Sequence, residues 1–286
     1  AMATPSNKAI FAEQGFESSE LSSVGPDSLV VAVRAETAEA LDAAWGGLEA
    51  ALNGDSDSSR TSATCGSLAQ ALRAAPDANL CVVSVPGEYA AAQARAAMEA
   101  GLHVMIYSDN VPLEQDRALK QFAAEKGVLC MGPDCGVCTI GGAALGTASV
   151  VRSGPVGIVG ASGSGVQQIA CVVEREGLGV SQAIGVGGKD LLDEVGGISM
   201  LAGIDALERD DATTVIVLVS RTPGTQTLPR ILQRVQSCAK PVVVYFIGGD
   251  PAQVESSGAI AATNNEDAAV KAGDCEGARR LMAEHI

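Results

Sequence analysis

The sequence predicts an α/β protein with two doubly wound domains, each built on a parallel β-sheet. Short apolar segments typical of buried strands alternate along the chain with helical segments, and this alternation indicates βαβ units. The 286 residues, 47% of them hydrophobic, are sufficient for two separate cores. The 33 glycines permit the tight turns and close backbone approaches that α/β folds use around phosphate groups.

The first half of the chain contains four predicted strands. A helix is expected over residues 4–14, because Pro5 stands in its first turn and Gly15 follows its end. The polar segment 53–62 is expected to be a surface loop. The predicted strands are 28–35, 79–85, 102–107 and 128–131, and the further helices are 36–52, 67–75, 87–100 and 112–126.

The segment 132–154 shows little periodicity, and we interpret it as the crossing between two domains. The first domain is therefore predicted to span residues 1–150 and the second residues 151–286. After the crossing the alternation begins again, as expected of a self-contained doubly wound domain. Its predicted strands are 156–160, 181–186, 213–220 and 241–247, and its predicted helices are 165–176, 197–208, 225–238 and 267–285.

The composition argues against several classes of function. The net charge of −15 disfavours a nucleic-acid-binding surface, which needs clustered Lys and Arg. No segment has the roughly eighteen consecutive apolar residues of a membrane span, and no signal peptide is recognised. The eight cysteines are mostly scattered in apolar segments, as reduced cysteines are. We expect a soluble, cytoplasmic protein that binds neither nucleic acid nor membranes.

Metal and histidine chemistry is not expected. Cys130, Cys135 and Cys138 have a C-x4-C-x2-C spacing similar to plant-type iron–sulfur ligation, but a fourth ligand would have to come from a distant part of the chain. The two histidines, His103 and His285, lie outside the glycine-rich loops. The sequence therefore supports neither a Ser-His-Asp triad, nor a His-ligated metal, nor a phosphohistidine relay.

The strongest local motif is the run from Gly157 to Gly165, in which a predicted strand turns directly into a helix. The first N–H groups of a helix have no intrahelical partner, and the helix dipole adds partial positive charge there. Ser162, Gly163, Ser164 and Gly165 are therefore predicted to bind a phosphate-like anion. The alternative is an ordinary turn in which a serine caps the helix. The motif is not a Walker A sequence, because no Gly-Lys-Ser/Thr follows.

Two further loops follow predicted strands. Gly187 and Gly188 stand in a loop expected at the same carboxyl edge of the sheet, with Lys189 as a point charge for a phosphate. Asp190 is predicted to be either a proton acceptor or a helix cap. Cys135 lies in the glycine-flanked turn 132–136, where its thiol is either accessible and reactive or an inert part of a rigid turn.

Several motifs resemble the FdrA family, a branch of the superfamily that contains the succinyl-CoA synthetase α subunit. They are MGPDCG (131–136), GIVGASGSG (157–165), SQAIGVGGKDLLDEVGGISML (181–201) and AKPVVVYFIGG (239–249), together with TPSNKAIF (4–11) and SDNVPLEQD (108–116). The resemblance covers nearly the whole chain, and FdrA relatives are often longer. It implies a Rossmann-like CoA-binding-type domain followed by a flavodoxin-like CoA-ligase-type domain.

The resemblance also bears on the mechanism. In the synthetase α subunit, the helix N-terminus that matches residues 162–165 holds a phosphorylated histidine from a G-H-A-G-A-I motif. Here the matching stretch is 255–260, which places Ser256 at the position of that histidine. The relatives also have a glycine-rich CoA loop near their start, and residues 2–8 of this chain stand at that position without such a loop. The resemblance therefore implies phosphate binding without a phosphohistidine.

Three functions follow from the resemblance. The first is an oxamate carbamoyltransferase subunit in allantoin catabolism, which converts carbamoyl phosphate and oxamate to oxalurate and phosphate together with partner subunits. The second is a subunit of an NDP-forming acyl-CoA synthetase, with CoA as a substrate. The third is a non-catalytic scaffold subunit. The expected partners are a small anionic substrate and further subunits of a hetero-complex, a homodimer, or both; no bound cofactor or metal is assigned.

Overall fold

The computed structural model describes residues 3–26, 28–53 and 65–283. The chain divides into two compact units, residues 1–64 and residues 65–286, each described here by itself. This division differs from the predicted boundary between residues 150 and 151, which falls inside the second unit. None of the helices in the described ranges is both long enough and apolar enough to cross a membrane.

The first unit contains the helices α1 (Pro5–Glu13), α2 (Ser19–Ser23) and α3 (Ala38–Asn53). The Thr4 side chain accepts a hydrogen bond from Asn7 N at the start of α1, and Gly15 follows its end with a φ of 76°. The strand predicted over residues 28–35 is wrong: only Leu29 is in a bridge, and residues 30–35 form no strand. The described part of this unit contains no strand.

The second unit begins with residues 65–131, which we call the first lobe. It contains α4 (Leu68–Ala74), β1 (Leu80–Val83), α5 (Gly87–Glu99), β2 (His103–Ile106), α6 (Leu113–Lys126) and β3 (Cys130–Met131). Its parallel sheet has the order β1-β2-β3. Val104 and Ile106 of β2 share one core cluster with residues of α5 and α6, whereas Met105 belongs to the core cluster of the next lobe. The alternate side chains of β2 thus face two different cores.

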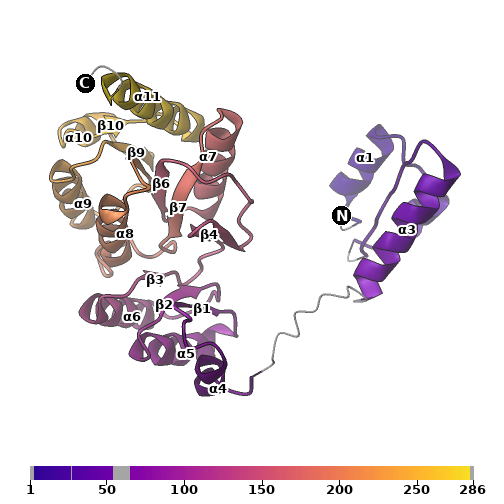
Figure 1. The fold of residues 1–286 in the computed structure, drawn as a ribbon, viewed down its shortest axis with the longest axis horizontal. Coiled ribbons are helices and arrows are strands. Elements are labelled where there is room, and N and C mark those ends of the chain that lie inside the picture. Colours follow the sequence, from indigo (N-terminus) through magenta and orange to yellow (C-terminus); the bar gives the residue numbers. More distant parts are fainter. Residues whose placement is uncertain (1–2, 27, 54–64, 284–286) are drawn as a thin grey trace. The chain divides into compact units, whose positions relative to one another are not determined.

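The second lobe, residues 137–283, has a seven-stranded sheet (Figure 1). Its elements are β4 (Val137–Ile140), β5 (Ala143–Gly146), β6 (Val156–Gly160), α7 (Gly163–Arg175), β7 (Val180–Gly185), α8 (Ile198–Arg209), β8 (Val215–Arg221), α9 (Thr227–Gln236), β9 (Val242–Ile247), α10 (Pro251–Glu255), β10 (Ile260–Ala261) and α11 (Asn265–Ala283).

The strand order β10-β9-β8-β6-β7-β4-β5 confirms the predicted flavodoxin-like fold. The five strands from β6 to β10 are parallel and follow the order 2-1-3-4-5 of that fold. The hairpin β4–β5 extends the sheet, because β4 pairs antiparallel with both β5 and β7. The segment interpreted as an aperiodic crossing is therefore partly an edge hairpin of the second sheet.

Helices cover both faces of this sheet, so the predicted doubly wound architecture is confirmed for the second lobe (Figure 1). Ile216 and Leu218 of β8 pack in the cluster that contains Met200 of α8 and Ile231 of α9. The alternate residues of β8 pack in a second cluster with α7 and α11, and Val217 is one of them. This alternation of period two is what burial of both faces of a strand requires.

Candidate functional site

The candidate site lies where the strand order of the second sheet reverses, between β6 and β8. The chain leaves β6 through α7 for β7 on one side, and it continues through α8 to β8 on the other side. Ligands of open α/β sheets bind outside the carboxyl ends of the strands at such a switch point. Here those ends are Gly160 and Arg221.

A cavity of about 450 Å³ lies at this position. It is bordered by the ends of β6 and β8, the loop after β7, and one residue of the turn before β4. The lining residues are Asp134, Ala161, Ser162, Gly188, Leu191, Leu192, Ser220, Arg221 and Thr222. The two glycine-rich loops that the sequence singled out therefore do border one cavity, although only Ser162 and Gly188 of the predicted anion-binding residues line it.

Ser162 is the N-cap of α7. Its backbone is extended, with a φ of −128°, and its Oγ accepts a hydrogen bond from Gly165 N at 3.2 Å. The Oγ atoms of Ser162 and Ser164 are 3.5 Å apart. Among the described residues, the N–H groups of Gly163 and Ser164 have no protein acceptor. The helix therefore presents two unpaired donors and its positive dipole end directly after the cavity-lining Ser162.

The glycine positions of these loops differ in whether the fold excludes a Cβ atom there. A Cβ on Gly160 would lie 2.3 Å from Val166 Cγ2, and one on Gly165 would lie 2.8 Å from Val219 Cγ2, so both are required by close helix–strand packing. Gly187 has a φ of +80°, and a Cβ there would lie 2.1 Å from the Pro133 oxygen. By contrast, a Cβ on Gly188 would meet nothing within 4 Å. Packing explains three of these glycines and leaves Gly188 unexplained.

Arg221 is a site residue that sequence reasoning missed. It ends β8, its side chain is exposed, and it lines the cavity. In the described part of the chain it forms no ion pair. Its guanidinium can therefore supply the positive charge and the paired donors that a phosphate or carboxylate requires. The sequence could have indicated this residue, because it directly follows the predicted buried strand 213–220, next to the switch point.

The loop that contains Lys189 and Asp190 contacts a buried cation, Lys120. Lys120 of α6 is fully buried, and its Nζ lies 3.0 Å from Asp116 Oδ1, 3.1 Å from Asp190 Oδ1 and 3.0 Å from the Val186 oxygen. Burial disfavours the charge of Lys120, but the carboxylates of Asp190 and Asp116 raise its pKa above the ordinary value of 10.5. Burial also raises the pKa of Asp116, although Lys120 opposes this.

These contacts place two predicted catalytic residues outside the cavity. Asp190 is fully buried and accepts hydrogen bonds from Ser199 N and Met200 N at 3.1 and 2.9 Å, so it is a cap of α8 and not an available base. Lys189 Nζ donates to the Val111 oxygen of the first lobe at 2.7 Å. Of the alternatives left open for Asp190, the structure supports the helix cap.

The accessible thiol considered at Cys135 is also wrong. Cys135 is 3% exposed, and its Sγ lies 3.3 Å from Cys138 Sγ. The hydrogen bond to Cys138 and burial both raise the pKa of Cys135, so the neutral thiol is its stable form. The neighbouring Asp134, which has a φ of 59°, lines the cavity instead.

His103 is not among the residues that line the cavity. His103 lies in β2, and its Nδ1 accepts a hydrogen bond from Leu129 N at 2.9 Å. His285 lies outside the described residues. Ser256 caps the end of α10 and donates to the Gln253 oxygen at 2.7 Å.

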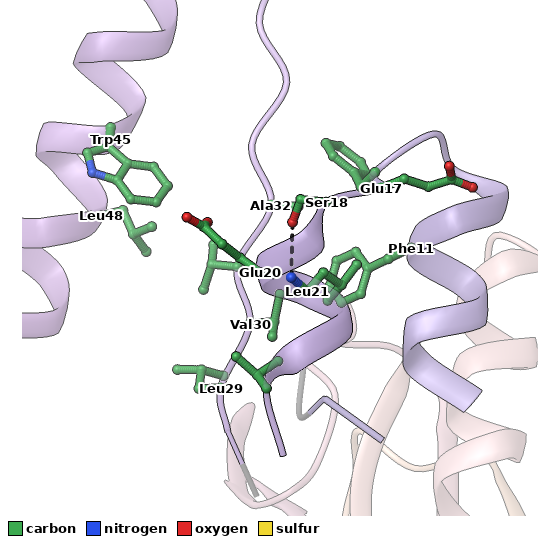
Figure 2. Close-up of a pocket in the computed structure, with 13 residues that line it drawn as sticks. Phe11, Glu17, Ser18, Glu20, Leu21, Leu29, Val30, Ala32, Trp45 and Leu48 are labelled. Carbon is green, nitrogen blue, oxygen red and sulfur yellow. Dashed lines mark hydrogen bonds between the residues drawn. The ribbon is translucent and has the colours of Figure 1, made fainter. Parts of the chain in front are cut away.

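A separate apolar pocket of about 480 Å³ lies within the first unit. Figure 2 shows Trp45 and Leu48 of α3 on one side and Leu21, Leu29 and Val30 on the other. Its lining is aromatic and aliphatic apart from Glu17, Ser18 and Glu20. It offers neither a paired donor set nor a cation for an anionic substrate.

Two family models match the chain. The model described as AllF, heavy metal-associated domain, matches residues 1–66, and the CoA binding domain model matches residues 151–248. The second match falls on the part for which the sequence predicts the CoA-ligase-type domain, and it includes the loops after β6, β7 and β8.

Individual relatives agree with these matches. The uncharacterized protein YahF of Escherichia coli is 39% identical over 272 residues, which are 95% of this chain and 53% of YahF. Succinate–CoA ligase [ADP-forming] subunit alpha 2 of Archaeoglobus fulgidus is 31% identical over 186 residues, 64% of this chain and 63% of that protein. The chain thus spans about half of YahF and less than two thirds of this ligase subunit.

Solved structures share the fold at low sequence identity. ATP citrate lyase of Methanosaeta concilii, in complex with (3S)-citryl-CoA, has a TM-score of 0.62 at 19% identity, covering 73% of this chain and 40% of that one. The dinucleotide-forming acetyl-coenzyme A synthetase 1 of Ca. Korarchaeum cryptofilum has a TM-score of 0.52 at 20% identity, covering 65% and 45%. Both confirm a fold of the CoA-ligase type.

These findings define the class of protein: an α/β protein of the CoA-ligase type with a succinate–CoA ligase α-like, CoA-binding fold. Within that class the chain is similar to YahF and to the succinate–CoA ligase α subunits, and residues 1–66 match the AllF-type domain, which is consistent with the resemblance to the FdrA family.

A heavy metal-associated domain implies a soft metal ion held by thiolates or imidazoles. Residues 1–66 contain one cysteine, Cys65, and no histidine. In the ranges that the structure describes, no three His, Cys, Asp or Glu side chains form a group that could hold a metal ion. The donor set of this domain therefore does not fit a thiolate-bound or imidazole-bound metal.

Proposed function

We propose that the chain is the FdrA-type subunit of an oxamate carbamoyltransferase and that the cavity between β6 and β8 binds carbamoyl phosphate. The observation that carries the proposal is the unpaired Arg221 beside the capped N-terminus of α7. A guanidinium and free helix N–H groups together form an anion site. No histidine of the described structure borders this site, and the proposed reaction uses no phosphohistidine.

The lining of the cavity includes both donors and an acceptor that suit the groups of carbamoyl phosphate. Ser162, the N-terminus of α7 and Arg221 provide donors for the phosphate. Asp134 provides a carboxylate that can accept hydrogen bonds from the carbamoyl NH₂ group. In this proposal, the Gly188 N–H also donates to the phosphate. Lys189 and Asp190 hold the loop of Gly188 against the first lobe instead of contacting substrate.

Catalysis in this site would consist of positioning and charge stabilisation. The oxamate nitrogen attacks the carbamoyl carbon, the bond between that carbon and the bridging oxygen breaks, and the departing phosphate takes the proton that the nitrogen loses. The negative charge that develops on the leaving phosphate is stabilised by Arg221 and the N-terminus of α7, which are already in place. The whole enzyme is proposed to contain further subunits, as the names of the ligase relatives indicate for those proteins.

Calorimetric titration of the chain with carbamoyl phosphate and with inorganic phosphate tests this proposal. Ser164→Asp places a like charge at the start of α7, and Arg221→Gln removes the cation, so both should weaken binding at least roughly tenfold. The matched control is Arg152→Gln, because Arg152 is an exposed arginine paired with Glu174 and away from the cavity. Equal affinity of all four proteins would place the anion elsewhere.

A second function is favoured by the match of residues 151–248 to CoA-binding domains. In this alternative the chain is a subunit of an NDP-forming acyl-CoA synthetase, and CoA is its substrate. Ser256 stands where the resemblance expects a phosphohistidine, so phosphoryl transfer would need a residue of another subunit. Tight binding of CoA that Arg221→Gln leaves unchanged, with no binding of carbamoyl phosphate, would favour this alternative.

A further inference from the structure

Three sulfur atoms lie together in the core beside the candidate cavity. Cys135 Sγ and Cys138 Sγ are 3.3 Å apart, and Cys138 Sγ is 3.6 Å from Met131 Sδ. Cys138 also accepts a hydrogen bond from Gly185 N at 3.3 Å. The proposed group transfer uses none of these sulfurs, and the spacing of the two cysteines is the C-x-x-C of dithiol–disulfide proteins.

We propose that Cys135 and Cys138 form a reversible intramolecular disulfide with hydrogen peroxide as the oxidant. Bond formation brings the two Sγ atoms from 3.3 Å to about 2.05 Å. The fold leaves room for the sulfur only because residue 185 is glycine: a Cβ there would lie 2.5 Å from Cys135 Sγ. This inference goes beyond the proposed function and does not depend on it.

The environment distinguishes the roles of the two sulfurs. The hydrogen bond between Cys135 and Cys138, together with the one from the Gly185 N–H, lowers the pKa of Cys138 despite burial, whereas the pKa of Cys135 is raised. Cys138 is therefore the first nucleophile and Cys135 the resolving thiol. Burial raises the pKa of Cys130 to about 12, and no sulfur contact joins Cys130 to the pair.

The reaction balances in two steps. The Cys138 sulfur attacks one peroxide oxygen; an S–O bond forms, the O–O bond breaks, and the departing hydroxide takes the thiol proton to become water. The Cys135 sulfur then attacks the Cys138 sulfur; the S–S bond forms, the S–O bond breaks, and a second water leaves with the Cys135 proton. Two thiols are oxidised and one peroxide is reduced to two waters.

Burial determines which oxidants can act. Cys135 and Cys138 are 3% and 0% exposed, so a bulky disulfide reagent cannot reach them in the folded protein, whereas peroxide is about the size of two water molecules. Asp134, the residue before Cys135, lines the cavity. The disulfide would therefore form directly behind the wall of the candidate site.

Peptide mass spectrometry of the full chain tests this inference. The folded protein is first treated with N-ethylmaleimide to block exposed thiols such as Cys171, and then with hydrogen peroxide. It is next denatured and alkylated with iodoacetamide without reduction. Trypsin cleaves after Lys126 and Arg152, so residues 127–152 form one peptide with Cys130, Cys135 and Cys138.

The expected product is that peptide with one alkylated cysteine, Cys130, and with the mass of two hydrogen atoms missing. Dithiothreitol before alkylation should restore three alkylated cysteines. Cys130→Ser should still form the bond, and Cys138→Ser should not. Three results in the wild type would each overturn the proposal. The first is a peptide with three alkylated cysteines at a peroxide dose that oxidises Cys171 in protein not treated with N-ethylmaleimide. The others are a disulfide that includes Cys130 and sulfinic acids in place of a disulfide.

Discussion

Two adjacent glycines, Gly187 and Gly188, should respond to the same substitution in opposite ways. Gly187 has a left-handed backbone, and its Cβ would lie 2.1 Å from a main-chain oxygen, whereas Gly188 has neither constraint and lines the cavity. Gly187→Ala should therefore destabilise the fold, while Gly188→Ala should leave it intact and place a methyl group in the anion site.

The magnitudes follow from these environments. The left-handed conformation costs a residue with a Cβ roughly 1–2 kcal/mol, and the contact with Pro133 adds to this in Gly187→Ala. In a unit of this size each kcal/mol lowers Tm by about 2–4 °C. The free energy of unfolding of Gly188→Ala should stay within about 0.5 kcal/mol of the wild type. Its phosphate affinity should fall roughly tenfold or more, because loss of a charge-assisted hydrogen bond costs about 1.5–3 kcal/mol.

Urea unfolding and calorimetric titration with phosphate measure the two effects separately. The control is Gly47→Ala in α3 of the first unit, where a Cβ also meets nothing within 4 Å. Wild-type phosphate affinity in Gly188→Ala would refute the assignment of this glycine to a ligand. Equal destabilisation by Gly187→Ala and Gly188→Ala would refute the steric reasoning.

Three further predictions concern the buried groups of the second unit. Lys120→Met should lower the free energy of unfolding in urea by about 3–5 kcal/mol, because it leaves Asp116 and Asp190 buried without a cation; a change below 1 kcal/mol would contradict the buried network. The stabilising effect of Lys120 should be complete below the ordinary lysine pKa of 10.5 and should be lost as the pH rises through its higher folded-state pKa. The stability difference between wild type and Lys120→Met should therefore shrink at alkaline pH. A difference that grows would contradict the raised pKa of Lys120 in the folded state. In native alkylation followed by mass spectrometry, the exposed Cys171 should react long before Cys130, whose pKa burial raises to about 12; equal rates would contradict the burial of Cys130.

Much of the fold of the second lobe could be predicted from the sequence. Its buried parallel strands are apolar runs such as VIVLVSR in β8, and the helices between them end near the predicted residues. The hairpin β4–β5 could not be predicted, because glycines and alanines give it no alternating pattern. The apolar run 28–35 was misassigned because strand formation depends on a neighbouring strand, which local sequence does not show.

The candidate site was predicted in part. The capped helix after β6 has a local signature, and the structure places Ser162 and Gly188 on one cavity. The proton-acceptor alternative for Asp190 and the accessible-thiol alternative for Cys135 failed because burial and ion pairing come from α6, α8 and β4, elements distant in the sequence. Arg221 was missed for the same reason: its importance comes from the reversal of strand order beside it.

Binding of a phosphate group in the cavity between β6 and β8 can be measured without the partner subunits, by thermal unfolding of the wild type with carbamoyl phosphate, phosphate, oxamate or CoA. A ligand at ~100 times its dissociation constant should stabilise the native state by roughly 2.7 kcal/mol. Carbamoyl phosphate and phosphate should stabilise the wild type, and their effect should be smaller in Arg221→Gln. Stabilisation by CoA alone, or by no ligand, would contradict phosphate binding in this cavity.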